Sequence, residues 1–143
     1  METRWVVVAE SSRARIFEME GSGAPLRELS DLLNPEARAH ERDLVSDRQG
    51  RAFDSKGHAR HAMEPETSPG KRSAQDFAHE LAERIETARA RGQFERLLLL
   101  AAPEFLGMLR KNLSHQTRQL IEREIHKNCV REDESAIRRH MET

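Results

Sequence analysis

The run Leu97-Leu98-Leu99-Leu100-Ala101-Ala102-Pro103 decides the fold class of this chain. It is short, continuous and apolar, which is typical of a strand buried on both faces of a sheet. Pro103 suits the first turn of a following helix, because its missing N–H would be unpaired there in any case. The large apolar residues that follow recur at helical spacing: Phe105, Leu106, Leu109 and Leu113. The run therefore predicts a buried strand that leads directly into a helix.

A long amphipathic helix is predicted before this strand. Its apolar stripe consists of Phe77, Leu81, Ile85 and Ala88. The stretch Ser73-Ala74-Gln75-Asp76 matches the Ser-x-x-acid start signal, in which the serine and the acid satisfy amide groups of the first turn. Gly92 follows the stripe and favours the end of a helix. We therefore expect the helix to begin at Ser73 and to end before Gly92.

The amino-terminal part predicts a β-hairpin. Residues 5–9 and 15–19 are rich in β-branched and aromatic side chains, and turn-prone residues separate them. Residues 26–33 are ambiguous, because Leu26, Leu29 and Leu33 have the spacing of a two-turn helix. Their short length and their place after a hairpin also allow a third strand.

The carboxy-terminal part predicts one more strand and one more helix. Ile121, Arg123 and Ile125 alternate as in a strand, although residues 117–120 can extend the preceding helix first. Residues 135–141 predict a terminal helix. This order indicates a single α/β domain, with helices packed on a mixed sheet of about five strands and right-handed parallel crossovers in its second half.

Length and composition narrow the function classes. The 143 residues fit one domain, and 24 Lys and Arg residues nearly balance 25 Asp and Glu residues. This balance excludes a wholly cationic nucleic-acid binder but allows a local basic patch. The single cysteine, Cys129, excludes an intramolecular disulfide and predicts no cysteine-based zinc site.

The sequence also predicts a cytoplasmic protein without membrane insertion. Its longest apolar run, residues 97–103, is far shorter than the roughly 20 residues of a membrane helix. We find no signal-peptide pattern, and a lone thiol fits a reducing compartment. Phosphate loops, dinucleotide-binding loops, nucleophile elbows and helical zinc motifs are absent from the sequence, so we predict no cofactor and no catalytic residue.

Residues 34–72 are the main functional candidate, because they have almost no apolar periodicity and several glycines and prolines. Between Arg48 and His61, four Arg and Lys residues stand against one acid, Asp54, giving a local charge of 4 − 1 = +3. Guanidinium groups on such a glycine-hinged loop can bind a phosphate backbone. They can also pair with acids of the same loop, and the two roles do not exclude each other. The predicted nucleic-acid-binding residues are Arg42, Arg48, Gly50, Arg51, Phe53, Lys56 and Arg60.

Metal-dependent hydrolysis is a third and weaker hypothesis. His58 and His61 offer imidazole ligands beside nearby acids of the same loop. Glu10 lies at the end of the first predicted strand, where metal-dependent nucleases often place a carboxylate, with Asp31 and Glu80 as conceivable partners. Solvated or hydrogen-bonded histidines and solvated carboxylates explain these residues better, and we predict no metal site.

Several longer strings give the chain a family resemblance. They include Trp5-Val-Val-Val-Ala-Glu-Ser-Ser-Arg-Ala-Arg-Ile-Phe17, His40-Glu-Arg-Asp-Leu-Val-Ser-Asp-Arg48, Arg60-His-Ala-Met-Glu-Pro65, Leu99-Leu-Ala-Ala-Pro-Glu-Phe-Leu-Gly107 and Ile125-His-Lys-Asn128. With these strings the chain resembles the bacterial host-attachment protein family, whose name describes a phenotype and not a mechanism. The resemblance favours a strand for residues 26–33.

The family is similar in fold to the middle domain of archaeal and eukaryotic peptide-chain release factors. In that domain, a loop between the third strand and the first long helix enters the peptidyl-transferase centre and carries Gly-Gly-Gln. This chain has Arg48-Gln49-Gly50-Arg51 there, so release activity is not expected. The resemblance implies a non-catalytic domain associated with RNA or the ribosome. The alternative is a protein-interaction or regulatory module that affects attachment indirectly; the partner and the oligomeric state stay open.

Overall fold

The computed structural model describes residues 2–21, 23–37 and 69–142. Five strands form one sheet in the order β3-β2-β1-β4-β5. Strands β1, β2 and β3 pair antiparallel, whereas β4 pairs parallel with both β1 and β5. This arrangement confirms the predicted α/β fold with a mixed sheet. The elements are β1 (Thr3–Glu10), β2 (Arg13–Glu20), β3 (Arg27–Leu33), α2 (Pro69–Ala90), β4 (Arg96–Ala101), α3 (Pro103–Lys111), α4 (His115–Gln119), β5 (Ile121–Ile125) and α5 (Glu134–Glu142).

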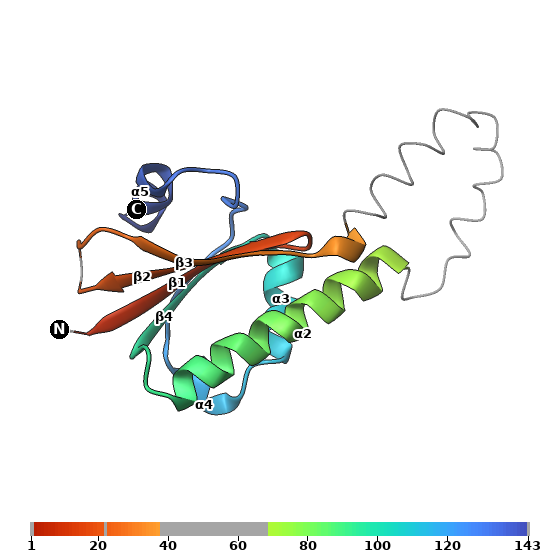
Figure 1. Cartoon of the computed structure of the whole chain (residues 1–143), viewed down its shortest axis with the longest axis horizontal. Coiled ribbons are helices and arrows are strands. Elements are labelled where there is room, and N and C mark those ends of the chain that lie inside the picture. Colours follow the sequence, from red (N-terminus) through yellow and green to blue (C-terminus); the bar gives the residue numbers. More distant parts are fainter. Residues whose placement is uncertain (1, 22, 38–68, 143) are drawn as a thin grey trace.

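Helices cover both faces of the sheet (Figure 1). Helices α2 and α3 pack on one face, and α5 lies on the other. The four leucines of β4 divide between these faces, because successive side chains of a strand point in opposite directions. Leu97 and Leu99 belong to the core under α2, and Leu98 and Leu100 belong to the core under α5. All four are buried, which confirms the predicted strand.

The predicted stripe of α2 is buried as expected, but the start of the helix was predicted wrongly. Helix α2 begins at Pro69, so Ser73 lies inside the helix and does not cap it. A proline fits the first turn, where its missing N–H costs no hydrogen bond. The hydroxyl of Ser73 is used instead by Asn34, whose side chain donates to it. Gly92 follows the helix with a φ of 69°, as predicted for a helix end.

Residues 27–33 form strand β3, at the edge of the sheet, and the helical spacing of their leucines is misleading. The register between β2 and β3 shifts at Ile16 and Phe17, which pair with Ser30 and Glu28 and leave Leu29 outside the paired register. Leu26 is buried just before the strand, whereas Leu29 and Leu33 remain 37% and 52% exposed. Leu26 precedes the strand and Leu29 lies at the register shift, so the three leucines do not form one helical face.

Helix α4 is separate from α3, and an acid on α2 fixes the junction between them. Ser114 caps α4, because its hydroxyl accepts a hydrogen bond from the N–H of Thr117 at 3.1 Å. The Glu86 carboxylate of α2 accepts the Ser114 N–H at 2.6 Å and the Ser114 hydroxyl at 3.1 Å. Burial raises the pKa of the Glu86 carboxyl, but the hydrogen bonds from Ser114, Thr117 and Arg89 outweigh it and hold that pKa below its ordinary value.

The other carboxy-terminal predictions are confirmed. Strand β5 covers residues 121–125, and α5 covers the predicted terminal helix with Ile137 fully buried. Within the ranges that the structure describes, no helix combines the length and the apolar character needed to cross a membrane.

We predict that Glu86→Gln lowers the free energy of unfolding at pH 7 by about 1 to 3 kcal/mol, because it weakens charged hydrogen bonds to Ser114. Since the folded-state pKa of Glu86 lies below the unfolded-state value of about 4.3, this stabilisation is complete above that value and disappears as the pH falls. Urea unfolding at pH 7 and at lower pH measures the difference. Glu80→Gln, an exposed change on the same helix, should cost less than about 0.5 kcal/mol. A constant difference between wild type and Glu86→Gln at every pH would contradict this assignment.

Candidate functional site

Four strands end at the same edge of the sheet. Strands β1, β4 and β5 are parallel, and β3 runs in the direction of β1 because both are antiparallel to β2. Ligands of open α/β sheets bind in crevices outside the carboxyl ends of the strands. The chain leaves β3 at this edge and returns to it at the start of α2, so both ends of the predicted functional segment meet there (Figure 1).

The Asn34 side chain holds these two ends together. Its Nδ2 donates to the Ser73 hydroxyl at 3.0 Å, to the Ser73 carbonyl at 3.3 Å and to the Ser11 carbonyl at 3.0 Å. Its backbone N–H donates to the Ser12 carbonyl at 2.9 Å. Asn34 and Ser73 are both buried. One carboxamide therefore links the end of β3, the turn between β1 and β2, and the first turns of α2; we call it the Asn34 clamp.

The local sequence explains why Asn34 can do this. A residue before proline is disfavoured in the helical region, so Asn34 stays outside the helical residues 35–37 that follow it. Its side chain then points back to the Ser11 carbonyl and to the carbonyl and hydroxyl of Ser73. A buried amide needs such partners, because an unpaired polar group in the interior costs free energy.

A cleft of about 410 Å³ opens beside the clamp. Glu10 and Ser11 line it from the end of β1, Lys71 from α2, Glu104 from α3, and Asn128 from the segment after β5. It therefore combines one ammonium group with two carboxylates. A cleft of this composition suits a ligand with hydrogen-bonding groups of both kinds better than a simple anion.

Glu10 is held in a fixed orientation at the cleft. One of its carboxylate oxygens accepts from Asn128 Nδ2 and the other accepts from the Ser12 hydroxyl, each at 2.7 Å. Asn128 is itself fixed, because its side-chain oxygen accepts the Val130 N–H at 3.2 Å. These bonds join β1 to the segment after β5 and make Glu10 part of the rim.

The structure does not bring together the three carboxylates of the hydrolase hypothesis. Asp31 accepts two hydrogen bonds from the Arg13 guanidinium, at 2.9 and 2.7 Å, and these bonds hold the pKa of its carboxyl below its ordinary value. Glu80 lines a different hollow, beside Leu33 and Phe77. In the described part of the chain, Glu10, Asp31 and Glu80 do not gather their oxygens into one metal-ligand group.

The residues predicted to bind nucleic acid lie outside the described residues. This holds for Arg42, Arg48, Gly50, Arg51, Phe53, Lys56 and Arg60, and also for His58 and His61. The sequence did not indicate the side chains that form the Asn34 clamp and hold Glu10 at the cleft, namely Asn34, Ser73 and Asn128. We call this part of the sheet edge the base of the segment. The Asn34-Pro35 dipeptide was the one available signal for Asn34.

Comparison with known families assigns the chain. Residues 5–141 match the family described as protein required for attachment to host cells. The chain belongs to this family. The comparison with curated proteins gives no match for this host-attachment family member. Among solved structures, an archaeal protein is similar with a TM-score of 0.44 and 9% identity. The match covers 88% of this chain but 30% of the archaeal chain, so this chain spans less than a third of that protein's length.

We predict that Asn34→Ala lowers the free energy of unfolding by about 1 to 3 kcal/mol, because the buried Ser73 hydroxyl and the part-buried Ser11 carbonyl lose their donor. Asn34→Asp should cost more, since a carboxylate would face the same oxygens. Urea unfolding measures both. Gln116→Ala, at an exposed side-chain amide of α4, is the matched control and should cost less than about 0.5 kcal/mol. An Asn34→Asp variant as stable as the wild type would contradict the clamp.

Proposed function

We propose that this host-attachment family protein associates with structured RNA, with the ribosome as the first candidate, and that it does so without catalysis. The observation that carries the proposal is the local charge of +3 between Arg48 and His61, in a chain whose net charge is −1. The described residues on either side of positions 38–68 are fixed at one edge of the sheet by the Asn34 clamp.

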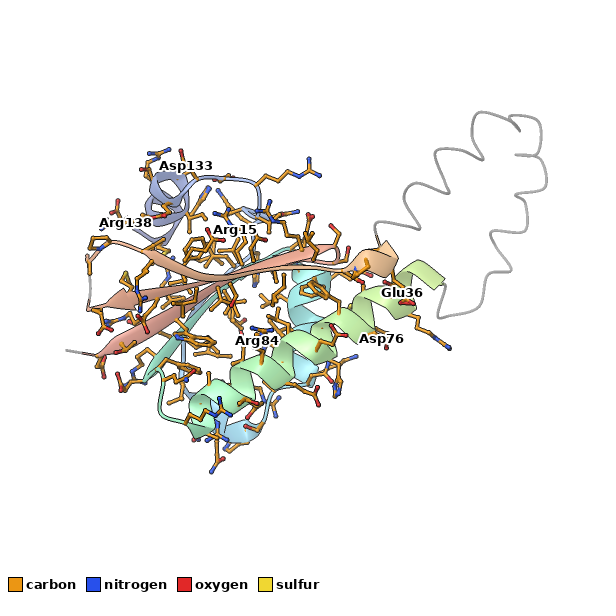
Figure 2. All side chains as sticks on the ribbon, viewed as in Figure 1. Arg15, Glu36, Asp76, Arg84, Asp133 and Arg138 are labelled. Atoms are coloured by element: carbon orange, nitrogen blue, oxygen red, sulfur yellow. The ribbon has the colours of Figure 1, made fainter. Side chains whose placement is uncertain are left out.

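The base of the segment does not supply the positive charge by itself. Lys71 and Arg72 are exposed in the first turns of α2, but Glu36 and Asp76 are exposed there too (Figure 2). Carboxylates at the base repel a phosphate backbone. The contact with RNA is therefore proposed for the arginines and the lysine of the segment, with the sheet as its support.

The salt dependence of binding follows from this charge. If Arg48, Arg51, Lys56 and Arg60 each contact one phosphate, the logarithm of the affinity should fall with the logarithm of salt concentration with a slope of roughly −3 to −4. Internal ion pairs within the segment would instead leave the affinity for RNA low at every salt concentration.

The test is co-sedimentation of the full chain with ribosomes over a series of KCl concentrations. We expect binding at low salt, and we expect Arg48→Glu combined with Arg51→Glu to weaken it at least tenfold, because two contacts are lost and two repulsions are added. Absence of binding at low salt would reject the proposal. A partner that resists RNase would favour the protein-interaction alternative.

The matched control carries the same change of charge at the other end of α2. Arg91 follows that helix and Arg118 lies in α4, and both are exposed. Arg91→Glu combined with Arg118→Glu should change ribosome binding less than about twofold. An equal loss in both double variants would show a nonspecific effect of net charge and contradict the role of the segment.

A further inference from the structure

Three side chains of metal-ligand type meet where the chain leaves β5 and enters α5. The thiol sulfur of Cys129, a carboxylate oxygen of Glu132 and a ring nitrogen of His140 lie within 4.8 Å of one another. His140 Nε2 is 2.8 Å from Glu132 Oε1. In the residues that the structure describes, no other group of three or more His, Cys, Asp or Glu side chains meets this distance criterion.

The backbone that carries Cys129 and Glu132 is anchored to the sheet. The Glu132 N–H donates to the Cys129 carbonyl at 3.0 Å, which closes a turn. Arg15, a buried residue of β2, donates from Nη1 to the carbonyls of Val130 at 3.0 Å and Glu132 at 2.7 Å. Figure 2 shows Arg15 on the α5 side of the sheet. The two ligand groups of the turn are therefore positioned before any ligand binds.

Helix α5 brings the third group. Asp133 begins it, since its side chain accepts the Ala136 N–H at 2.9 Å. Ile137 is fully buried against the sheet, and His140 lies one turn later on the same side of the helix. The packing of Ile137 thus directs His140 back toward the turn.

One side chain of the group is buried and the other two are partly exposed to solvent. Cys129 is 1% exposed, whereas the side chains of Glu132 and His140 are 39% and 26% exposed. The carboxylate and the imidazole are therefore open to solvent, whereas the thiol is buried.

We propose that Cys129, Glu132 and His140 bind one Zn²⁺ ion. Thiolate, imidazole and carboxylate are the three side-chain ligands of protein zinc sites, and three protein ligands leave a fourth position for water. Tetrahedral bonds of about 2.0 to 2.3 Å separate ligand atoms by roughly 3.3 to 3.6 Å. The separation between His140 and Glu132, 2.8 Å, lies below this range and none of the three exceeds 4.8 Å, so binding of an ion requires small movements of these side chains. The thiol releases its proton to solvent on binding.

The charges around the group are compatible with a divalent cation. A thiolate and a carboxylate balance the two charges of Zn²⁺. The nearby Arg15 guanidinium is positive, but Glu28 accepts two hydrogen bonds from it, at 3.0 and 3.1 Å, and neutralises it. The prediction that a single cysteine gives no cysteine-based zinc site considered thiolates alone, whereas a mixed site needs only one.

The test measures zinc affinity of the chelator-stripped full chain by competition with a chromophoric chelator. We expect one Zn²⁺ per chain, and at least a tenfold loss of affinity in His140→Gln and in Cys129→Ser, because each removes a ligand. His140→Gln is the primary variant, since Cys129 is buried and its replacement can disturb folding. Circular dichroism of the stripped variants checks that they fold.

A cobalt spectrum gives a second readout of the thiolate ligand. Co²⁺ bound to the protein should show a thiolate-to-metal charge-transfer band in the wild type and in His115→Gln.

Two controls keep the proposal falsifiable. His115→Gln removes an exposed histidine of α4 outside the group and should leave zinc affinity unchanged. His58→Gln combined with His61→Gln tests the histidines of residues 38–68. Zinc binding that survives His140→Gln, that disappears in the His58 and His61 variant, or that falls short of one ion per chain would overturn the proposed site.

Discussion

The Asn34 carboxamide is the constraint on which the functional edge of this protein depends. It joins positions that are 39 residues apart, Asn34 and Ser73, and it ties both to the turn between β1 and β2. Its acceptors are buried or part-buried oxygens, so loss of the donor removes hydrogen bonds that water replaces poorly. The chain enters and leaves residues 38–68 close to this link, so the link fixes where that segment meets the sheet.

The charged residues near the ends of the candidate binding segment are of both signs, whereas the positive excess lies within the segment. Around the base, Lys71 and Arg72 are accompanied by Glu10, Glu36 and Glu104, so the rim is mixed. The sequence concentrates its positive excess between residues 48 and 61. Residues 38–68 as a whole carry six Arg and Lys residues against six Asp and Glu residues, so the positive excess is local to residues 48–61. The family description names a process, attachment to host cells, and the proposal supplies a physical contact that can be measured.

The sequence predicted the parts of the fold that depend on local periodicity. The leucines of β4, the hairpin and the stripe of α2 follow directly from apolar spacing. Apolar spacing alone left residues 26–33 ambiguous, and the resemblance correctly favoured a strand there. The predicted start of α2 was wrong, because Ser73 lies inside the helix and accepts a hydrogen bond from Asn34 instead of capping it. The site was less predictable still, since Asn128 reaches Glu10 across 118 residues and no local pattern indicates that pair. The mixed group at Cys129 likewise forms only after α5 folds back.

The central claim is that the basic residues between positions 48 and 61 bind the ribosome from a base that the Asn34 clamp fixes. The salt dependence of ribosome affinity, compared between the wild type and Asn34→Ala, tests this claim most directly. Dissociation constants of the wild type and of Asn34→Ala are measured over the same KCl series. The account predicts a slope of roughly −3 to −4 for both, with the Asn34→Ala line parallel and displaced toward weaker binding, because the same phosphates are contacted from a looser base. A wild-type slope near zero, or two coincident lines, would contradict it.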